Sequence, residues 1–340
     1  MRGLFTLFRR LFIFLTMTML VVMSAGWLWF SHIWEAAGPQ NEDSLLYILP
    51  GTNHGQLANQ LHRENYLADG WLYPILRFGY SLVEGASFAP KAGEFLIPAR
   101  ASYQDLFRII DTGTPYQHRI LITEGMRTDE VVRTLTSDDR LSGAIVTYPE
   151  EGSLAPDTYF FVRDTNRADL LGRMQQRQEM ILAEEWANRR DGLPYETAQD
   201  ALIMASVIEK ESGLVREQPL IASVFINRLT TNMRLQSDAS VLYGIIMEEG
   251  AARDIRKSDL KKDGPWNSYR RSGLPQTAIA NPGRKAIHAA LNPLPSTYFY
   301  FVADGRGGHN FAKTLDEHNR NVKAYRRLVK QRANKPSEDQ

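Results

Sequence analysis

The sequence predicts an α+β protein that is held to a membrane by one N-terminal helix. Residues 11–30 form an uncharged apolar run. Short strand–turn–helix patterns then recur through residues 45–148, and a longer region of mixed helices, loops and strands fills residues 149–330. The expected architecture is therefore a transmembrane helix, a small α+β module and a mixed α/β domain.

The apolar run is "LFIFLTMTMLVVMSAGWLWF", and a helix needs about twenty such residues to cross a bilayer. Basic residues precede it and acidic residues follow it: Arg2, Arg9 and Arg10 before, Glu35, Glu42 and Asp43 after. Because basic residues favour the cytoplasmic side, residues 1–10 are expected inside and the rest of the chain outside. Trp27 and Trp29 lie at the outer end, where indole rings favour the interface.

A cleaved signal peptide is the alternative to a retained anchor. Its apolar core is usually about 7 to 15 residues long, which is shorter than this run. No clear small-x-small cleavage site follows residue 30. Both observations favour a retained transmembrane helix.

Composition excludes several classes of function. The 340 residues include 40 basic and 39 acidic ones, so the net charge of +1 gives no strong field to attract nucleic acid. The sequence has no cysteine. Disulfides, a thiol nucleophile, cysteine-ligated zinc and a lipid-modified cysteine are therefore all excluded.

Three segments of residues 45–148 share one pattern, in which a short apolar strand leads through a turn into a helix. The strands are expected at 47–49, 95–97 and 120–122. The helices carry apolar residues one turn apart: Leu57 and Leu61, Leu106 and Ile110, Val131 and Leu135. Such small units bury little surface alone, so we expect them to pack as one module after a polar linker over residues 31–44.

The region from residue 149 is expected to be rich in helices. One covers residues 167–188, and a last one covers 315–330 before a disordered tail over 331–340. The first has apolar residues spaced as a buried stripe: Leu170, Leu171, Met174, Met180, Ile181 and Trp186. A helix between them contains "SVIEKES", residues 206–212.

The two glutamates of that motif, Glu209 and Glu211, fall on different faces of the helix. Successive residues turn by about 100 degrees, which places Glu211 within the apolar stripe of its own helix. Glu209 and Lys210 fall on the other side and are expected to be solvated. A simpler interpretation stays open, because Glu211 lies near the expected helix end at Gly213, where its side chain can reach solvent.

A buried carboxyl group holds its proton to higher pH, because burial disfavours the ionised form. A glutamate that stays protonated near neutral pH is what a general acid for glycosidic cleavage requires. Glu211 is therefore the candidate catalytic residue.

Seven motifs occur in an order that resembles the MltG-type (YceG-like) endolytic murein transglycosylase family. They are "KAGEF", "EGSLAPDTYFF", "MASVIEKES", "ASVFINRL", "MRLQSDASVLYG", "GLPQTAIANPG" and "YFYFVADGRGGHNFAKTLDEHN". Together with the anchor, the resemblance covers nearly the whole chain.

The resemblance implies a LysM-like module followed by a catalytic domain over residues 149–330. The family cleaves the β-1,4 bond between N-acetylmuramic acid and N-acetylglucosamine within glycan strands and leaves 1,6-anhydro-muramyl ends. The second glutamate of its Glu-Lys-Glu motif is catalytic, which corresponds to Glu211. One carboxyl group suffices, because the C6 hydroxyl of the sugar attacks in place of water. No metal or organic cofactor is expected.

The resemblance also implies a cellular location. The chain is expected in the bacterial cytoplasmic membrane as a single-pass protein, with its catalytic domain in the periplasm. It would terminate the growth of nascent peptidoglycan strands beside the synthases, the penicillin-binding proteins. Its other partner is the lipid bilayer around residues 11–30.

Polar residues at motif positions are candidates for substrate contact: Asn227, Gln236, Asp238 and Asn267. Amide groups suit the hydroxyls and acetamides of the sugars, although turns and caps favour the same residue types. Asp157 and Tyr159 either border the cleft or belong to a loop-to-strand turn. The same choice between substrate contact and structure applies to each of them.

His309 follows a glycine-rich turn, "GRGGHNF", and is a further candidate for substrate contact. The turn lacks the Lys-Ser/Thr pair of a phosphate-binding loop. His309 and His318 lack a convincing set of further ligands for zinc.

Two other functions remain open. A hydrolase would use Asp238 or Asp157 as a second carboxylate. A non-catalytic scaffold would bind peptidoglycan through the LysM-like module alone. The chain also departs from the family pattern at three positions: Gln276 and Thr277, where Pro-Gly is common, and Trp266, where tyrosine is common.

Overall fold

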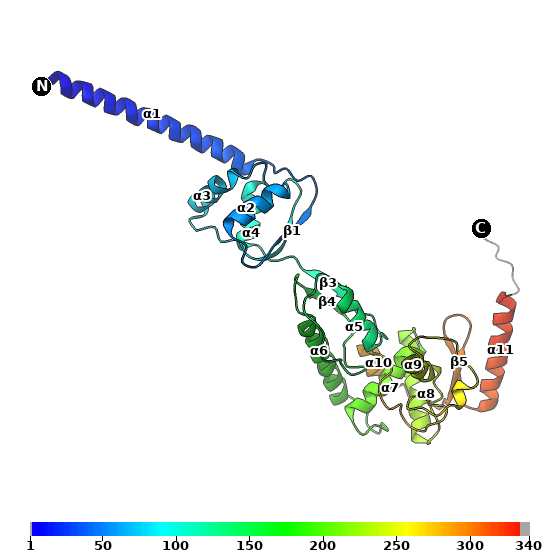
Figure 1. Ribbon diagram of the computed structural model, residues 1–340. Helices are drawn as coiled ribbons and strands as arrows, with labels where there is room; N and C mark the ends of the chain where they lie inside the picture. The colour runs from blue at the N-terminus through cyan, green and yellow to red at the C-terminus, as the bar shows by residue number, and fades with distance from the viewer. Residues whose placement is uncertain (1, 334–340) are drawn as a thin grey trace. The chain divides into compact units, whose positions relative to one another are not determined.

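The computed structural model describes residues 2–333 (Figure 1). The chain divides into two compact units. Unit 1 runs to His118 and includes Phe161–Arg163, and unit 2 comprises Arg119–Phe160 and the chain from Asp164 onward. Both units combine helices with two-stranded sheets, so the α+β class and the N-terminal apolar helix are confirmed.

Unit 1 contains α1 (Arg2–Glu35), β1 (Ser44–Ile48), α2 (His54–Arg63), α3 (Leu72–Glu84), β2 (Gly93–Ile97) and α4 (Tyr103–Thr112). Strands β1 and β2 pair antiparallel, with Leu46 opposite Phe95. Asn53 and Ser102 begin α2 and α4, and each forms a capping box that satisfies backbone N–H groups of the first turn.

Aromatic rings fill the core of unit 1. The ring centroids of Phe88 and Phe107 lie 4.6 Å apart, and Tyr80 meets Phe88 edge-on. Trp34, near the end of α1, is 3% exposed and its ring lies 5.8 Å from that of Phe107. The last turns of α1 therefore belong to this core, whereas the sequence predicted a polar linker from residue 31.

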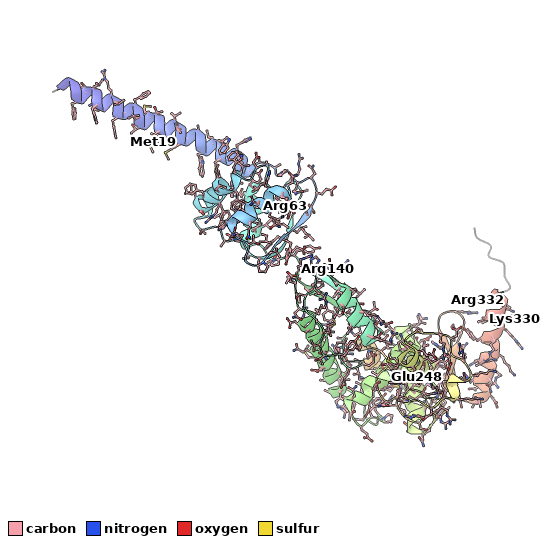
Figure 2. The ribbon with its side chains drawn as sticks, viewed as in Figure 1. Met19, Arg63, Arg140, Glu248, Lys330 and Arg332 are labelled. Carbon is pink, nitrogen blue, oxygen red and sulfur yellow. The ribbon has the colours of Figure 1, made fainter. Side chains whose placement is uncertain are left out.

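Most of α1 is a bare apolar helix. The stretch Phe5–Glu35 is long and apolar enough to cross a membrane, and Met19 projects from its exposed surface (Figure 2). Phe30 and Trp34 are the buried residues of this stretch. The bare helix thus meets the folded unit at Phe30.

Unit 2 holds most of the remaining elements. They are β3 (His118–Leu121), α5 (Thr128–Ser137), β4 (Thr158–Phe161), α6 (Arg167–Ala187), α7 (Ala198–Glu211), η1 (Val215–Glu217), α8 (Gln218–Thr230), α9 (Asp238–Glu249), η2 (Asp259–Lys261), α10 (Arg284–Leu291), β5 (Tyr300–Ala303), β6 (His309–Ala312) and α11 (Leu315–Ala333). Strand β3 pairs with β4, and β5 pairs antiparallel with β6.

Helix α7 is the centre of unit 2. A capping box at Thr197 begins it, and the residues Ala201–Ile208 are all buried. Helices α6, α8, α9 and α10 pack around it. A helix that is buried on all sides needs apolar residues on all sides, which explains the sequence "ALIMASVI".

The predicted strand–turn–helix patterns are confirmed as β1–α2, β2–α4 and β3–α5, and their paired apolar residues are buried. The third pattern packs mainly within unit 2, although the sequence grouped it with the other two. Met180 is 64% exposed, so its assignment to the buried stripe of α6 was wrong. Of the predicted tail, residues 331–333 are helical and 334–340 lie outside the described residues.

Candidate active site

Glu211 is the last residue of α7 and lies where two pockets of unit 2 meet. Its Oε1 accepts a hydrogen bond from the hydroxyl of Ser237. Ser237 is the N-cap of α9 and also accepts from the N–H of Ser240 at 3.4 Å. The carboxyl group is thus held in one orientation by the start of a neighbouring helix.

The first pocket, the apolar pocket, has a volume of about 440 Å³. Aliphatic side chains dominate its lining, with two basic residues: Arg127, Lys210, Glu211, Asp238, Ala239, Leu242, Tyr243, Ile246, Ala252, Ile255 and Ile279.

The second pocket, the polar pocket, has a volume of about 350 Å³. Polar and aromatic groups dominate its lining: Glu211, Arg228, Gln236, Asp238, Tyr269, Tyr300, Phe301, Val302, Ala303, His309, Leu315 and His318. The two pockets adjoin at Glu211 and Asp238, which line both of them, and we call the two pockets together the groove. Each pocket falls in the size range of small-molecule sites, about 300–1,000 Å³.

Burial is the main influence on Glu211 and raises its pKa. The hydrogen bond from Ser237 opposes the rise, and the neighbouring charge of Asp238 adds to it. His309 and Arg228 act in the opposite direction, and the net pKa is raised. A carboxyl group in this state can donate a proton at pH values where an exposed glutamate is ionised.

Asp238 is the other carboxylate among the described residues that line the groove. Its Oδ1 accepts from the hydroxyl of Tyr269 at 2.7 Å. Arg228 lies deeper, with its guanidinium 5.3 Å from the ring centroid of Tyr300. Arg228 also donates to the backbone carbonyls of Phe299 and Leu235, so it joins α8 to the walls of the polar pocket.

His309 begins β6 and lines the polar pocket. Its Nδ1 lies 2.7 Å from Oε2 of Glu217, and its backbone N–H donates to Oε1 of the same carboxylate at 3.3 Å. Glu217 therefore fixes the ring and leaves Nε2 available to the pocket. The glycines before His309 allow this approach, because a Cβ at Gly308 would lie 2.7 Å from Glu217 Oε1.

Gln236 has a left-handed backbone, with φ of 51°. Its N–H donates to the carbonyl of Ser268 at 3.1 Å, and its side chain lines the polar pocket. A residue other than glycine is uncommon in this conformation, and such strain gathers at functional sites.

Four predicted site residues lie away from the groove. The amide of Asn227 donates to the carbonyls of Ser296 and Tyr298, and the hydroxyl of Tyr159 donates to Ala155. Asp157 forms an ion pair with Arg177. The contacts of Asn227 and Asp157 join distant segments of unit 2, whereas that of Tyr159 closes a local turn four residues long.

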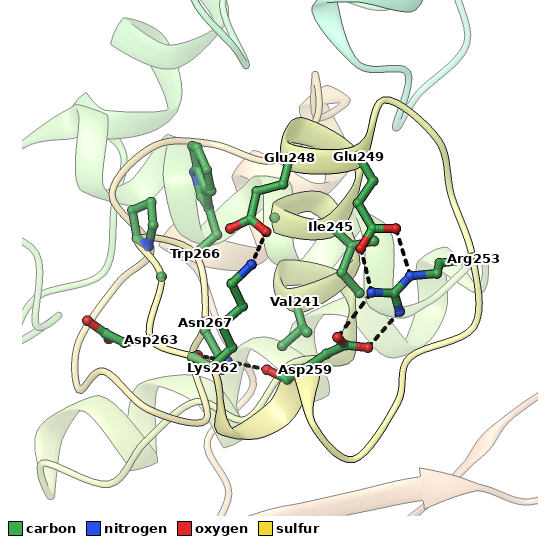
Figure 3. Close-up of a pocket in the computed structure, with 13 residues that line it drawn as sticks. Val241, Ile245, Glu248, Glu249, Arg253, Asp259, Lys262, Asp263, Trp266 and Asn267 are labelled. Atoms are coloured by element: carbon green, nitrogen blue, oxygen red, sulfur yellow. Dashed lines mark hydrogen bonds and ion pairs between the residues drawn. The ribbon is translucent and has the colours of Figure 1, made fainter.

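Asn267 is the fourth, and it borders a small pocket of about 40 Å³ beside α9 (Figure 3). Its amide donates to the carbonyls of Asp259 and Lys262 and so fixes the turn between them. Arg253 bridges Glu249 and Asp259 at the same pocket. This space is too small for a sugar.

The expectation for Glu209 was wrong. This residue is half-buried, and its Oε2 accepts the N–H of Gly283 at 2.9 Å. Burial raises its pKa, and the charge of Glu124 adds to the rise. The prediction assumed one apolar stripe on α7, whereas all of Ala201–Ile208 is buried and the chain at Gly283 lies against Glu209.

Sequence reasoning missed one carboxylate that lies beside the groove. Glu151 accepts from Thr128 and, at 3.1 Å, from the hydroxyl of Tyr243, which lines the apolar pocket. The indole N–H of Trp266 donates to Thr277 at 2.9 Å. Two of the positions that depart from the family pattern therefore contact each other. The motif "EGSLAPD" could have pointed to Glu151, since it opens with that residue.

A sequence model of the YceG-like family matches residues 46–324, which is well over half of the chain. The chain belongs to the YceG-like family. The groove, its two carboxylates and the fixed ring of His309 all lie within the YceG-like region.

Two similar proteins are named endolytic murein transglycosylase. The one from Bacillus subtilis is 36% identical over 183 residues, which cover 53% of this chain and 49% of that protein. The one from Streptococcus pneumoniae is 24% identical over 92% of this chain and 64% of that protein. The YceG-like chain thus spans between about half and two thirds of the relatives it matches. A solved YceG-like structure from Listeria monocytogenes aligns at 26% identity with a TM-score of 0.49, over 82% of this chain and 99% of that one.

Proposed function

We propose that this protein is a membrane-anchored lytic transglycosylase that cleaves peptidoglycan glycan strands internally. Its bond would be the β-1,4 link between N-acetylmuramic acid and N-acetylglucosamine, and its products would carry 1,6-anhydro-muramyl ends. The names of the two relatives support this activity. The observation that carries the proposal is the position of Glu211, a carboxyl group of raised pKa with a pocket on either side.

A groove that continues past the acid in both directions suits a polymer that is cut within its length. Sugars on one side of the cleaved bond would occupy the apolar pocket, and sugars on the other side would occupy the polar pocket. Gln236, Asp238 and His309 line the polar pocket and would hydrogen-bond hydroxyl and acetamide groups there.

The chemistry needs one carboxyl group used twice. Protonated Glu211 donates its proton to the glycosidic oxygen as the bond to the anomeric carbon breaks. The C6 hydroxyl of the same muramyl residue attacks that carbon, and the Glu211 carboxylate takes the hydroxyl proton. The first proton stays on the O4 hydroxyl of the released N-acetylglucosamine, the C6 hydroxyl proton restores the acid form of Glu211, and no water is consumed. Ser237 occupies Oε1, which leaves Oε2 to carry the proton.

The anchor and the location belong to the same proposal. Helix α1 would span the cytoplasmic membrane with residues 1–10 inside and both units in the periplasm. Unit 1, with its antiparallel strand pair and intervening helices, would be the LysM-like module. Near the membrane the enzyme would meet nascent strands beside the penicillin-binding proteins and terminate their growth.

Digestion of purified glycan strands followed by mass spectrometry tests the activity. Anhydro ends support a transglycosylase, reducing ends would show a hydrolase, and uncut strands would show a scaffold. Asp238 is the second carboxylate that a hydrolase would need. Asp157 is engaged by Arg177 away from the groove, so the structure gives no support to its use.

Glu211→Gln is expected to lower the cleavage rate by at least about 10²–10⁴-fold, because the proton donor is lost. Glu209→Gln is the matched control, two positions away on the same helix. It keeps an acceptor for Gly283 and should retain most activity. A dead Glu209→Gln beside an active Glu211→Gln would overturn the assignment.

A further inference from the structure

Helix α3 of unit 1 exposes an apolar face. Trp71, Ile75, Phe78 and Leu82 recur at helical spacing, and their side chains are 58%, 36%, 67% and 60% exposed. The opposite side of the helix is buried in unit 1 through residues such as Leu76 and Tyr80. We call the four exposed side chains the α3 face.

Such a helix is unusual on a water-facing surface, where the outer side is normally charged or polar. Arg77 is half-buried, and Glu84 at the helix end is paired with Arg108 at 2.8 Å. Four large apolar side chains therefore stand together with little charge between them. Exposed apolar patches of this kind mark interaction sites.

The α3 face lies beside the end of the bare part of α1. The rings of Trp29 and Trp71 stack with centroids 6.5 Å apart. Phe30 sits against Gly79 so closely that a Cβ there would lie 1.9 Å from the ring. The glycine thus provides the notch that lets α1 and α3 pack together.

These two contacts also give the direction of α3. Residues 71 and 79 are about 12 Å apart along the axis of α3, at 1.5 Å per residue. Their contact partners on α1, residues 29 and 30, are only about 1.5 Å apart along the axis of that helix. Helix α3 therefore crosses α1 rather than running along it (Figure 1). A helix that crosses a membrane span is inclined toward the plane of the membrane, so its exposed face can meet the membrane surface.

We propose that the α3 face is inserted in the interfacial layer of the outer leaflet, so that unit 1 rests on the bilayer. This inference rests on the proposed anchor. The predicted span ends at Phe30, and no linker separates Phe30 from the core that contains Trp34. Unit 1 must then begin at the membrane surface, at the depth where tryptophan and phenylalanine side chains are favoured.

Lipid is a better occupant of this face than another protein. The face is continuous with the apolar surface of α1 through the Trp29–Trp71 stack. A membrane that surrounds the span up to Phe30 reaches the α3 face without any further assembly. A second copy or a partner's transmembrane helix would have to displace lipid from both helices.

The absence of cysteine from the sequence allows a direct test in the full-length protein. The single-cysteine variants Met19→Cys, Phe78→Cys and Gln117→Cys each replace an exposed residue. Each variant is labelled with an environment-sensitive dye and reconstituted in phosphatidylglycerol–phosphatidylethanolamine vesicles. Quenching is measured with lipids that carry a nitroxide near the headgroup or deep in the acyl chain, and with iodide in the water.

The proposal predicts that the dye at position 78 shifts to the blue on reconstitution and loses emission to the shallow nitroxide, while the dye at 117 is quenched by iodide alone. The dye at 19 should respond to the deep nitroxide, which reports the anchor independently. A dye at 78 that iodide quenches freely overturns the inference while the anchor stands. A dye at 78 that is quenched by neither iodide nor the nitroxide lipids indicates a protein partner and overturns the membrane placement of the α3 face. Equal quenching by the nitroxide lipids at positions 78 and 117 also overturns it. Loss of deep quenching at 19 would show that the anchor itself has failed.

Discussion

Glu211 is held by groups that favour its two protonation states to different degrees. Burial and the charge of Asp238 favour the protonated acid, whereas Ser237, His309 and Arg228 favour the carboxylate. An acid–base residue must use both states in one cycle, so neither can be stabilised too far. In the proposed reaction, burial of the carboxyl group and one firm hydrogen bond from Ser237 would keep both states within reach.

The raised pKa has a consequence for stability. The folded protein holds a proton on Glu211 that the unfolded chain releases, so stabilisation is complete below the ordinary pKa of 4.5 and is lost as pH rises through the raised folded value. Glu211→Gln stays neutral throughout. The Tm of the variant minus that of the wild type should therefore increase between about pH 5 and pH 8, as followed by scanning calorimetry.

A Tm difference for Glu211→Gln that stays flat over this pH range would mean that Glu211 is ionised in the folded protein.

At the scale of single elements, the short turn before α9 combines a strained backbone with a place in the lining of the polar pocket. Gln236 adopts φ of 51° immediately before the N-cap Ser237, and its side chain enters the polar pocket. The left-handed backbone of Gln236 costs about 1–2 kcal/mol, and a glycine at this position would avoid that cost. The chain thus keeps a side chain at a position where the backbone conformation alone favours glycine.

Gln236→Gly relieves this strain but makes the unfolded chain more flexible, so the free energy of unfolding should change by less than about 1 kcal/mol. Activity should fall by about tenfold, the loss of roughly one hydrogen bond to substrate. Steady-state cleavage rates and urea unfolding check both parts. Asn232→Gly is the matched control, with φ of 57° outside the groove, and should leave the rate unchanged. Equal losses of rate in both variants would contradict a substrate role for Gln236.

Helices and strands with a regular apolar pattern could be predicted from the sequence. Which neighbouring elements cover each face of a helix could not. The three strand–turn–helix patterns were found because Leu57, Leu106, Val131 and their partners repeat with a helical period. The exposure of Met180 and the burial of Glu209 depend on which neighbours cover α6 and α7. Helix α3 was missed because its apolar residues occupy both sides, and one-sided periodicity is the usual signal.

Of the residues predicted for the site, the structure brings Glu211, Gln236, Asp238 and His309 together along the groove. The other polar motif residues serve the scaffold instead, because asparagine and aspartate fasten loops as readily as they bind sugars. No local pattern separates these two uses.

At the scale of the whole of unit 2, loops far apart in sequence are joined by one buried amide. Asn281 is fully buried, its Oδ1 accepts the N–H of Leu154 at 2.9 Å, and its Nδ2 donates to the carbonyl of Met126 at 3.0 Å. Its backbone N–H and C=O also bond to residues 126 and 125. The walls of the apolar pocket depend on these loops through Arg127 and Ile279.

Asn281→Ala is expected to lower the free energy of unfolding by about 2–4 kcal/mol, because it leaves a buried N–H and a buried carbonyl with fewer partners. Chemical denaturation of the purified protein measures the change. Asn310→Ala, at an exposed position of β6, should stay within about 0.5 kcal/mol of the wild type. A comparable small change for Asn281→Ala would show that these loops are held by other contacts.

With α1 as the proposed membrane anchor, the burial of Phe30 and Trp34 would also decide how the protein can leave the membrane. Release of an anchored enzyme by a protease requires an accessible cut between the span and the folded domain. Here that stretch is helical and its side chains are built into the core of unit 1. Even a cut in the loop at residues 36–43 would leave α1 held by the same rings, so shedding would require unit 1 to unfold first.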